Sequence, residues 1–415
     1  MRANPLYRSD NTRPMTLRLL RIALVLGLLS AIGPFAIDMY LPALPAIGAS
    51  LNAGIGEVQM TLTAFFLALA LGQLLYGPVS DMVGRKPPLY FGLALFLLAS
   101  IGCALATDIH VLNALRFLQG LGAAAGMAIP RAVVRDLHTG NDAARLMSLL
   151  MLVFSVSPIL APLAGSLVIA ASGWRGVFWA VALAALAGVG LTALYLKETR
   201  SAAERVESSL ASALRAYGVL LRDGHYLGLV FIAGFAMAGF FVYLAGSSFV
   251  LINHYGLTPM QYSLAFGMNA ASFIAVSQFN GALGERFGLA NVVRPAALGC
   301  ALVMAAMLAY FAAGGDRLAV LLVLWFIASA FMGVVVPTTS VLALERHGAI
   351  AGTASALLGT LQMATGALMM TVVGYFADGT PLPMVAGMSA GVGIAWLLSR
   401  VTLGGRRAQP RLAEL

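Results

Sequence analysis

The fold is decided by a stretch that reads Gly77-Pro-Val-Ser-Asp81-Met-Val-Gly84-Arg85-Lys86, of which a partial copy, Gly281-Ala-Leu-Gly-Glu285-Arg286-Phe-Gly288, follows 204 residues later. Both stretches lie between long apolar segments, and their glycine and acidic positions keep the same spacing. A repeat of about half the 415-residue chain indicates two similar halves. Two similarly oriented halves are typical of large secondary transporters.

The composition places the chain in a lipid bilayer. Hydrophobic residues make up 60% of the sequence, charged residues only 10%, and the mean hydropathy is +0.90. Soluble globular proteins carry about 25% charged residues, so a soluble protein is excluded. The net charge of +9 does not indicate nucleic-acid binding, because the basic residues are scattered over short loops. Cys103 and Cys300 lie in separate apolar runs and indicate neither a disulfide framework nor a metal site.

We expect an all-α integral membrane protein with twelve transmembrane helices. Apolar runs of about 20 residues, bounded by charged or helix-breaking residues, predict the spans. These are 17–46, 56–79, 87–107, 109–134, 143–170, 174–196, 226–252, 261–283, 291–313, 317–344, 350–376 and 383–402. The first span continues through Asp38 without a small-residue cleavage site, so it is predicted to be retained rather than removed as a signal peptide.

The arginines predict the orientation of the spans. Apart from Arg116, Arg175 and Arg317, every Lys and Arg falls on the side of the N-terminus. The positive-inside rule then places both termini in the cytoplasm. The predicted organisation is a cytoplasmic tail (1–16), an N-terminal six-helix half (17–196), a cytoplasmic linker (197–225), a C-terminal six-helix half (226–402) and a second cytoplasmic tail (403–415).

The linker contains apolar residues at helical spacing. Leu210, Leu214, Tyr217 and Leu221 lie on one face if the segment is helical. It is therefore either a short amphipathic helix on the cytoplasmic surface or a solvated linker with chance spacing.

Several motifs together resemble the major facilitator superfamily. The Gly77 to Lys86 stretch resembles its motif A, and Leu112 to Ala124, with Arg116, Gln119 and Gly120, resembles the span-4 motif of its drug/proton antiporters. Ser157-Pro158-Ile-Leu-Ala161-Pro162-Leu-Ala-Gly165 resembles the span-5 antiporter motif, with Ala161 where glycine is usual. With the Ile37 to Pro45 stretch in span 1 and Gly173-Trp174-Arg175 before span 6, the set is similar to the bacterial Bcr/CflA branch, which exports drugs such as chloramphenicol, bicyclomycin and sulfonamides.

Asp38 and Arg116 are the candidates for proton coupling. They are the only acidic and basic residues deep within a predicted span, where a charge costs several kcal/mol unless it is paired or hydrated. Their distances from the outer ends of their spans, ~15 Å and ~9 Å at 1.5 Å per residue, allow one shared layer. Asp38 would carry the proton and Arg116 would be its electrostatic partner, directly or through water or substrate. The alternative is a static ion pair that only fixes helix packing.

The motif A loop is predicted to be a conformational latch. Asp81 would accept hydrogen bonds from the start of a span in the other half, and Arg85 would hold Asp136 at the end of span 4. The resemblance implies that this latch stabilises the outward-facing state. The alternative is that these charges only fix the topology. The predicted latch comprises Gly77, Asp81, Gly84, Arg85, Lys86 and Asp136.

Further residues are predicted to shape the substrate site and the motion. Gln119, on the Arg116 face, would orient the guanidinium or bind substrate. Pro158, Pro162 and Gly165 would allow span 5 to bend, and Gly122 and Gly126 would allow close helix approach. The substrate-binding candidates are Asp38, Met39, Tyr40, Gln119, Met127, Met151, Phe154, Phe240, Phe241, Tyr243, Asn269 and Gln362.

These features predict a proton-coupled exporter of small amphipathic drugs in a bacterial inner membrane. Some relatives carry a second acid two turns before the aspartate, where this chain has Ser30, so neutral or zwitterionic drugs should be favoured over cations. The alternatives are a metabolite exporter of the same fold, a membrane-embedded enzyme and a lipid scramblase. We expect a monomer without enzyme activity, cofactor or metal site.

Overall fold

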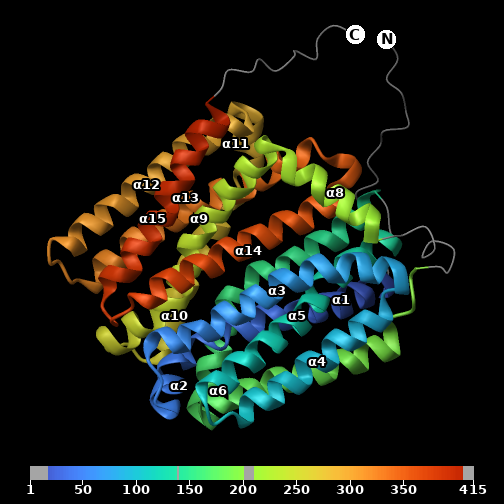
Figure 1. The fold of residues 1–415 in the computed structure, drawn as a ribbon, viewed down its shortest axis with the longest axis horizontal. Coiled ribbons are helices and arrows are strands. Elements are labelled where there is room, and N and C mark those ends of the chain that lie inside the picture. The colour runs from blue at the N-terminus through green and yellow to red at the C-terminus, as the bar shows by residue number, and fades with distance from the viewer. Residues whose placement is uncertain (1–16, 138–139, 201–209, 405–415) are drawn as a thin grey trace, which may run out of the picture.

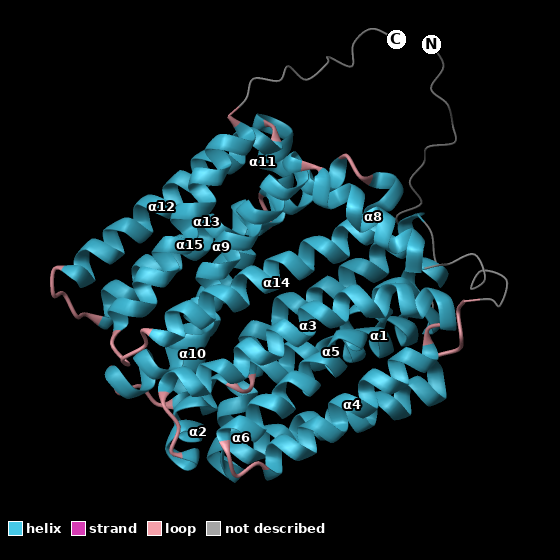
Figure 2. Cartoon of the chain, viewed as in Figure 1, coloured by secondary structure: helices cyan, strands magenta, loops and turns pink. Residues whose placement is uncertain are grey.

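The computed structural model describes residues 17–137, 140–200 and 210–404, and in these ranges every regular element is a helix (Figure 2). Ten of the described helical segments are long and apolar enough to cross a membrane. The predicted all-α membrane fold is therefore confirmed. The predicted tails, apart from residues 403 and 404, lie outside the described residues.

The N-terminal half forms the blue to green bundle of Figure 1. Its elements are α1 (Leu17–Asp38), η1 (Leu41–Ala43), α2 (Leu44–Leu51), α3 (Ile55–Val83), α4 (Lys86–Leu105), α5 (Ile109–Leu137) and α6 (Gly140–Tyr195). The last of these contains both the predicted fifth and sixth spans. Gly173, with φ 69° and ψ −177°, has a non-helical backbone and separates them.

The C-terminal half forms the yellow to red bundle. Its elements are α9 (Gly224–Ser248), the π-helical η2 (Phe249–His254), α10 (Pro259–Ser277), α11 (Asn280–Phe287), α12 (Leu289–Ala312), α13 (Leu318–Glu345), η3 (Gly348–Ile350), α14 (Ala351–Tyr375) and α15 (Pro381–Leu403). The predicted span 261–283 is wrong at its end, because α10 stops at Ser277 and a separate helix starts at Asn280. The α10 segment is also not among the ten apolar segments.

The duplicated loops have the same backbone geometry. Gly84 and Gly288, which are equivalent in the repeat, have φ values of 98° and 80°. Non-glycine residues rarely adopt this left-handed region, so both copies require glycine there. The sequence repeat is thus a structural repeat.

The linker contains a helix, α8 (Leu210–Arg222), as one of the two alternatives predicted. It contacts α3, α9 and α14, and the Tyr217 hydroxyl lies 3.5 Å from the Leu74 carbonyl oxygen of the N-terminal half. Of the predicted apolar face, Tyr217 packs against the protein whereas Leu214 and Leu221 are exposed, and Leu220 beside that face is buried. The helix therefore bridges the two halves.

The halves meet mainly through α3 against α14 and α6 against α10. Figure 1 shows α14 running beside α3 along the boundary between the bundles. One apolar cluster continues across that boundary, with the rings of Phe66 and Phe241 4.7 Å apart. This boundary positions the candidate site.

Candidate functional site

Asp38 is a buried carboxylate with one hydrogen-bond donor. It is the last residue of α1, its side chain is only 6% exposed, and the Ser157 hydroxyl of α6 donates to its Oδ2 atom at 3.2 Å. In the part of the chain that is described, no Lys, Arg or His nitrogen lies within 4.0 Å of this carboxylate. Asp38 is therefore buried without a direct counter-ion.

The surroundings of Asp38 belong to both halves. The η1 turn that follows it contacts α6 in its own half and α9 and α10 in the other. In the other half, the hydroxyls of Ser247 on α9 and Tyr262 on α10 lie 3.2 Å apart. A movement of the halves would change the environment of this carboxylate.

Arg116 is fully buried and lies in an aromatic cage rather than against Asp38. Its guanidinium carbon is 4.4 Å from the ring centroids of both Tyr40 and Phe65 and 5.9 Å from that of Phe178. Of the predicted arrangements, direct pairing of Asp38 and Arg116 is thus absent, whereas pairing through water or substrate stays a prediction. The reason is that the Arg116 side chain lies against Tyr40. Asp38 is two positions before Tyr40, and side chains two positions apart on a helical backbone point to different faces, so Asp38 points away from Arg116.

Gln119 holds the guanidinium as the sequence predicts. Arg116 Nη1 donates to Gln119 Oε1, and Gln119 Nε2 donates to the Ser100 hydroxyl at 2.7 Å. The same Nη1 atom lies 3.5 Å from the Ala36 carbonyl oxygen. The Nε and Nη2 atoms of Arg116 are buried without a partner among the described residues.

The C-terminal aromatic candidates form one cluster on the other side of the boundary. Asn269 donates to the Tyr243 hydroxyl at 3.2 Å, and the Tyr243 ring lies 5.0 Å from that of Trp325. Phe240 and Phe241 extend this cluster, and Phe241 reaches Phe66 of the N-terminal half. The structure brings these candidates together, while their role in substrate binding stays a prediction.

The remaining substrate candidates are dispersed. Met39 is buried against Gly165, and Met127 is buried beside Gly33. Phe154 is half-buried against the apolar core, and Gln362 lies 3.4 Å from the Ser340 hydroxyl. Met151 alone among them lines one of the cavities described for this chain.

That cavity, hereafter the latch-side cavity, has a volume of about 430 Å³ and lies between the two halves. Its walls come from α3, α5 and α6 on one side and α14 on the other. It is lined by Gln73, Gly77, Asp81, Arg85, Ala128, Arg131, Ala132, Arg135, Met147, Met151, Ala351, Gly352, Ser355 and Ala356. Three predicted latch residues therefore form part of its wall.

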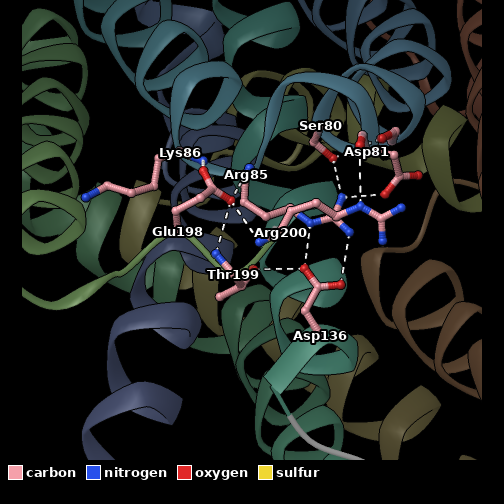
Figure 3. Close-up of polar contacts among 9 residues, drawn as sticks. Ser80, Asp81, Arg85, Lys86, Asp136, Glu198, Thr199 and Arg200 are labelled. Atoms are coloured by element: carbon pink, nitrogen blue, oxygen red, sulfur yellow. Dashed lines mark hydrogen bonds and ion pairs between the residues drawn. The ribbon is translucent and has the colours of Figure 1, made fainter. Parts of the chain in front are cut away.

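Arg85 is the centre of the predicted latch (Figure 3). Its guanidinium donates two hydrogen bonds to Asp136, of 2.7 and 3.0 Å, and one each to Ser80 and Asp81 at 2.7 Å. Burial opposes its charge, but the bonds and charges of Asp136 and Asp81 outweigh burial and raise the pKa of Arg85. The expected contact with Asp136 is present, whereas the Asp81 carboxylate accepts a hydrogen bond from Arg85 rather than from a helix start in the other half.

The segment after α6 also contributes to the latch, which no sequence motif predicts. Glu198 accepts hydrogen bonds from the backbone N–H groups of Arg85 and Lys86 at 2.8 and 3.1 Å, and the Thr199 hydroxyl donates to Asp136 at 2.8 Å (Figure 3). An acid directly at the end of a span, at the face that carries the motif A loop, is the signal that points to this contact. The latch cluster thus ties together three segments of one half.

The span-5 prolines lie where the halves touch. Pro158 and Pro162 are inside α6, and the Ser263 hydroxyl of α10 donates to the Pro162 carbonyl oxygen at 2.9 Å. Gly165 allows the close approach of Met39, because a Cβ atom there would overlap the Met39 backbone.

Residues 26–370 match the sequence model of the Major Facilitator Superfamily. The chain belongs to this superfamily. It is 38% identical over 369 residues to an uncharacterized transporter of this type, YdgK, from Bacillus subtilis (strain 168), covering 88% of this chain and 91% of the relative. It is 31% identical over 382 residues to a bicyclomycin resistance protein homolog from Haemophilus influenzae, covering 90% and 94%.

Solved structures of this superfamily share the fold. A bacterial homolog of the lysosomal transporter Spinster superposes with a TM-score of 0.74 over 92% of this chain and 96% of that one, at 16% identity. At this identity the likeness shows the fold alone. Membership in the Major Facilitator Superfamily makes the protein a multi-pass membrane transporter and not an enzyme, and its bacterial relatives place it in the bacterial inner membrane.

Proposed function

We propose that this transporter exports small amphipathic drugs in exchange for protons, with Asp38 as the proton carrier. The observation that carries the proposal is the position of Asp38, a buried carboxylate without a direct counter-ion beside the boundary of the halves. The resemblance to antibiotic resistance proteins supports the class of substrate.

The coupling follows from the cost of a charge in apolar surroundings. An ionised carboxylate is stabilised by water and costs several kcal/mol in a dry interior. When the halves open and close over Asp38, its proton occupancy has to follow the change in hydration. A drug that takes the place of the proton, by donating a hydrogen bond to the carboxylate, then links drug release to proton uptake.

Arg116 has a positioning role in this mechanism. Through the Tyr40 ring and the Ala36 carbonyl it contacts residues on both sides of Asp38 in sequence. By fixing Ala36 and Tyr40, the guanidinium fixes the backbone on both sides of Asp38 and so keeps the carboxylate within reach of the Ser157 hydroxyl. The guanidinium thus orients the proton carrier without accepting its proton.

The test is drug-induced proton movement in proteoliposomes. Asp38→Asn keeps the shape but cannot exchange a proton, so it should abolish proton release on addition of chloramphenicol and abolish uphill drug export. Glu345→Gln, an exposed acid at the end of α13, is the matched control and should behave as wild type. Uphill export by Asp38→Asn at near the wild-type rate would refute the role of Asp38.

A further inference from the structure

The charges around the latch-side cavity are not balanced. Arg131 and Arg135 lie one turn apart on α5 and both line it. Among the described residues, neither has a carboxylate within 4.0 Å. Asp81 is the acidic residue of the wall, and Arg85 already holds its carboxylate at 2.7 Å. The wall therefore presents excess positive charge.

The side chains of the two arginines are placed to face a ligand. Arg131 is half-buried, and its Nε atom donates to the Met127 carbonyl oxygen at 2.8 Å, which leaves the two terminal nitrogens for other acceptors. Arg135 reaches Gly352 of α14 across the boundary of the halves. Guanidinium groups donate hydrogen bonds in a planar fork that suits nitro, carbonyl, sulfonyl and carboxylate oxygens.

The rest of the wall fits an amphipathic molecule. Met147 and Met151 supply flexible, polarisable apolar surface, and Gln73 and Ser355 supply neutral polar groups. A volume of about 430 Å³ falls within the usual range for sites that hold drug-sized ligands.

The cavity at the opposite end of the boundary has a different charge. It has a volume of about 640 Å³, lies between α3 and α14, and is lined by Glu57 and His110 but by no Lys or Arg. Excess positive charge is thus a property of the latch side and not of both ends of the boundary.

We propose that Arg131 and Arg135 determine substrate class, by binding the acceptor oxygens of neutral or anionic drugs in the latch-side cavity and excluding organic cations from it. This rests on the proposed drug export and adds residues that select the drug. Each fixed charge near a bound cation in a hydrated cavity is worth about a fivefold change in affinity.

The experiment compares two radiolabelled probes by equilibrium binding to purified protein in detergent: chloramphenicol, which is neutral, and tetraphenylphosphonium, a cation. The double variant Arg131→Gln/Arg135→Gln should bind the cation roughly 10- to 25-fold more tightly and chloramphenicol several-fold more weakly. Opposite changes for the two probes do not arise from partial unfolding. Arg294→Gln/Arg346→Gln, which removes two exposed arginines outside the cavity, should leave both affinities unchanged.

Two further measurements separate charge from shape. Arg131→Lys/Arg135→Lys keeps the charge and should still exclude the cation, although it loses the planar fork. Raising salt from 0.1 M to 1 M shortens the screening length from about 10 Å to about 3 Å, so cation binding should improve in wild type and not in the Gln double variant.

The inference is overturned if the ratio of the two affinities in the Gln double variant stays within about twofold of wild type, including the case in which neither protein binds the cation. Absence of chloramphenicol-induced proton release by wild-type proteoliposomes would instead refute the proposed function. Because binding in detergent needs no proton gradient, the two failures are distinguishable.

Discussion

At Arg116 a full positive charge is held in the interior by aromatic faces and dipoles. The guanidinium lies between the Tyr40 and Phe65 rings and is bonded to Gln119. A cation over a desolvated ring gains about 2 kcal/mol, which offsets part of the cost of burying it. The cage therefore joins α5 to α3 and to the segment between α1 and η1. It also positions Asp38, which lies in that region of the chain.

The ring and the hydroxyl of Tyr40 make separable contributions. Tyr40→Phe loses only the 2.8 Å bond between the Tyr40 and Thr61 hydroxyls and should lower the free energy of unfolding by about 1 kcal/mol. Tyr40→Leu also loses the ring over Arg116 and should cost about 3 kcal/mol. Thermal unfolding in detergent should rank wild type, Phe and Leu in that order, and Tyr375→Leu, at an 86% exposed site, should match wild type. Equal losses for Phe and Leu would mean that the ring does not stabilise Arg116.

The sequence predicts which charged residues lie deep in the membrane-spanning helices, but it does not predict which side chains they contact. The depth of a residue in the membrane follows from its number of residues from the helix end, so the sequence identifies Asp38 and Arg116 as buried charged residues. Gln119 is found because it lies three positions from Arg116 on one helix. The rotation of α1 about its axis depends on packing against α5 and α6, and no pattern within α1 encodes it. That is why the caging by Tyr40, Phe65 and Phe178 is visible only in three dimensions.

Among the helices, α5 depends on glycine for its contacts. A Cβ atom on Gly122 would lie 2.6 Å from the Gly92 carbonyl oxygen and 2.6 Å from the Phe96 backbone nitrogen of α4. On Gly126 it would lie 2.8 Å from the Leu29 carbonyl oxygen of α1. The predicted close approach at these glycines is confirmed, and it brings backbones together as in other membrane helix pairs.

Gly122→Ala should therefore separate α4 from α5. Both overlaps involve backbone atoms that cannot rotate away, so we expect a loss of about 1–3 kcal/mol in the free energy of unfolding. Gly190→Ala is the matched control, because a Cβ atom there has no neighbour within 4 Å and alanine favours the helix. Unfolding curves in detergent measure both. If Gly122→Ala is as stable as Gly190→Ala, the helices do not need this contact.

Element boundaries are predicted well where hydropathy changes sharply and poorly where it does not. The ends of α12, α13, α14 and α15 lie within two residues of the predicted spans. The error falls at 277–280, where Ser277, Gln278 and Asn280 interrupt an otherwise apolar run. Asn280 donates to the Gly333 carbonyl oxygen of α13, a tertiary contact that favours a break and has no local signal.

Over the whole molecule, the duplicated sequence predicts the two halves, and the described contacts show how differently the copies are used. Gly84 leads into a loop whose Arg85 is bonded to Ser80, Asp81 and Asp136. In the second copy, Glu285 and Arg286 form no ion pair with any described residue, and no residue of α11 is buried. A sequence repeat therefore predicts the fold of both halves. The different contacts of the two loops depend on residues elsewhere in the chain, such as Glu198.

The latch can be tested by measuring the ratio of outward-facing to inward-open molecules, because Asp136 and Asp81 bind Arg85 to different extents. Removing Asp136 breaks two bonds to a buried guanidinium, whereas Asp81, with a 42% exposed side chain, supplies one bond and is screened by water. If the Arg85 cluster stabilises the outward-facing state, Asp136→Asn should shift the population ratio toward inward-open by roughly 30-fold and Asp81→Asn by roughly threefold, which correspond to about 2 and 0.7 kcal/mol.

Spin labels at Leu137 and Glu345, on the latch-side ends of α5 and α13, would report this shift as a longer distance in a background lacking Cys103 and Cys300. Asp108→Asn, at the opposite end of α5, is the control and should leave the distances unchanged, because its carboxylate only accepts bonds from its own helix start. Unchanged distances in both latch variants would mean that these charges fix topology alone. A larger shift for Asp81→Asn than for Asp136→Asn would assign the switch to Asp81, and the two-bond pair of Arg85 with Asp136 would then only stabilise the N-terminal half.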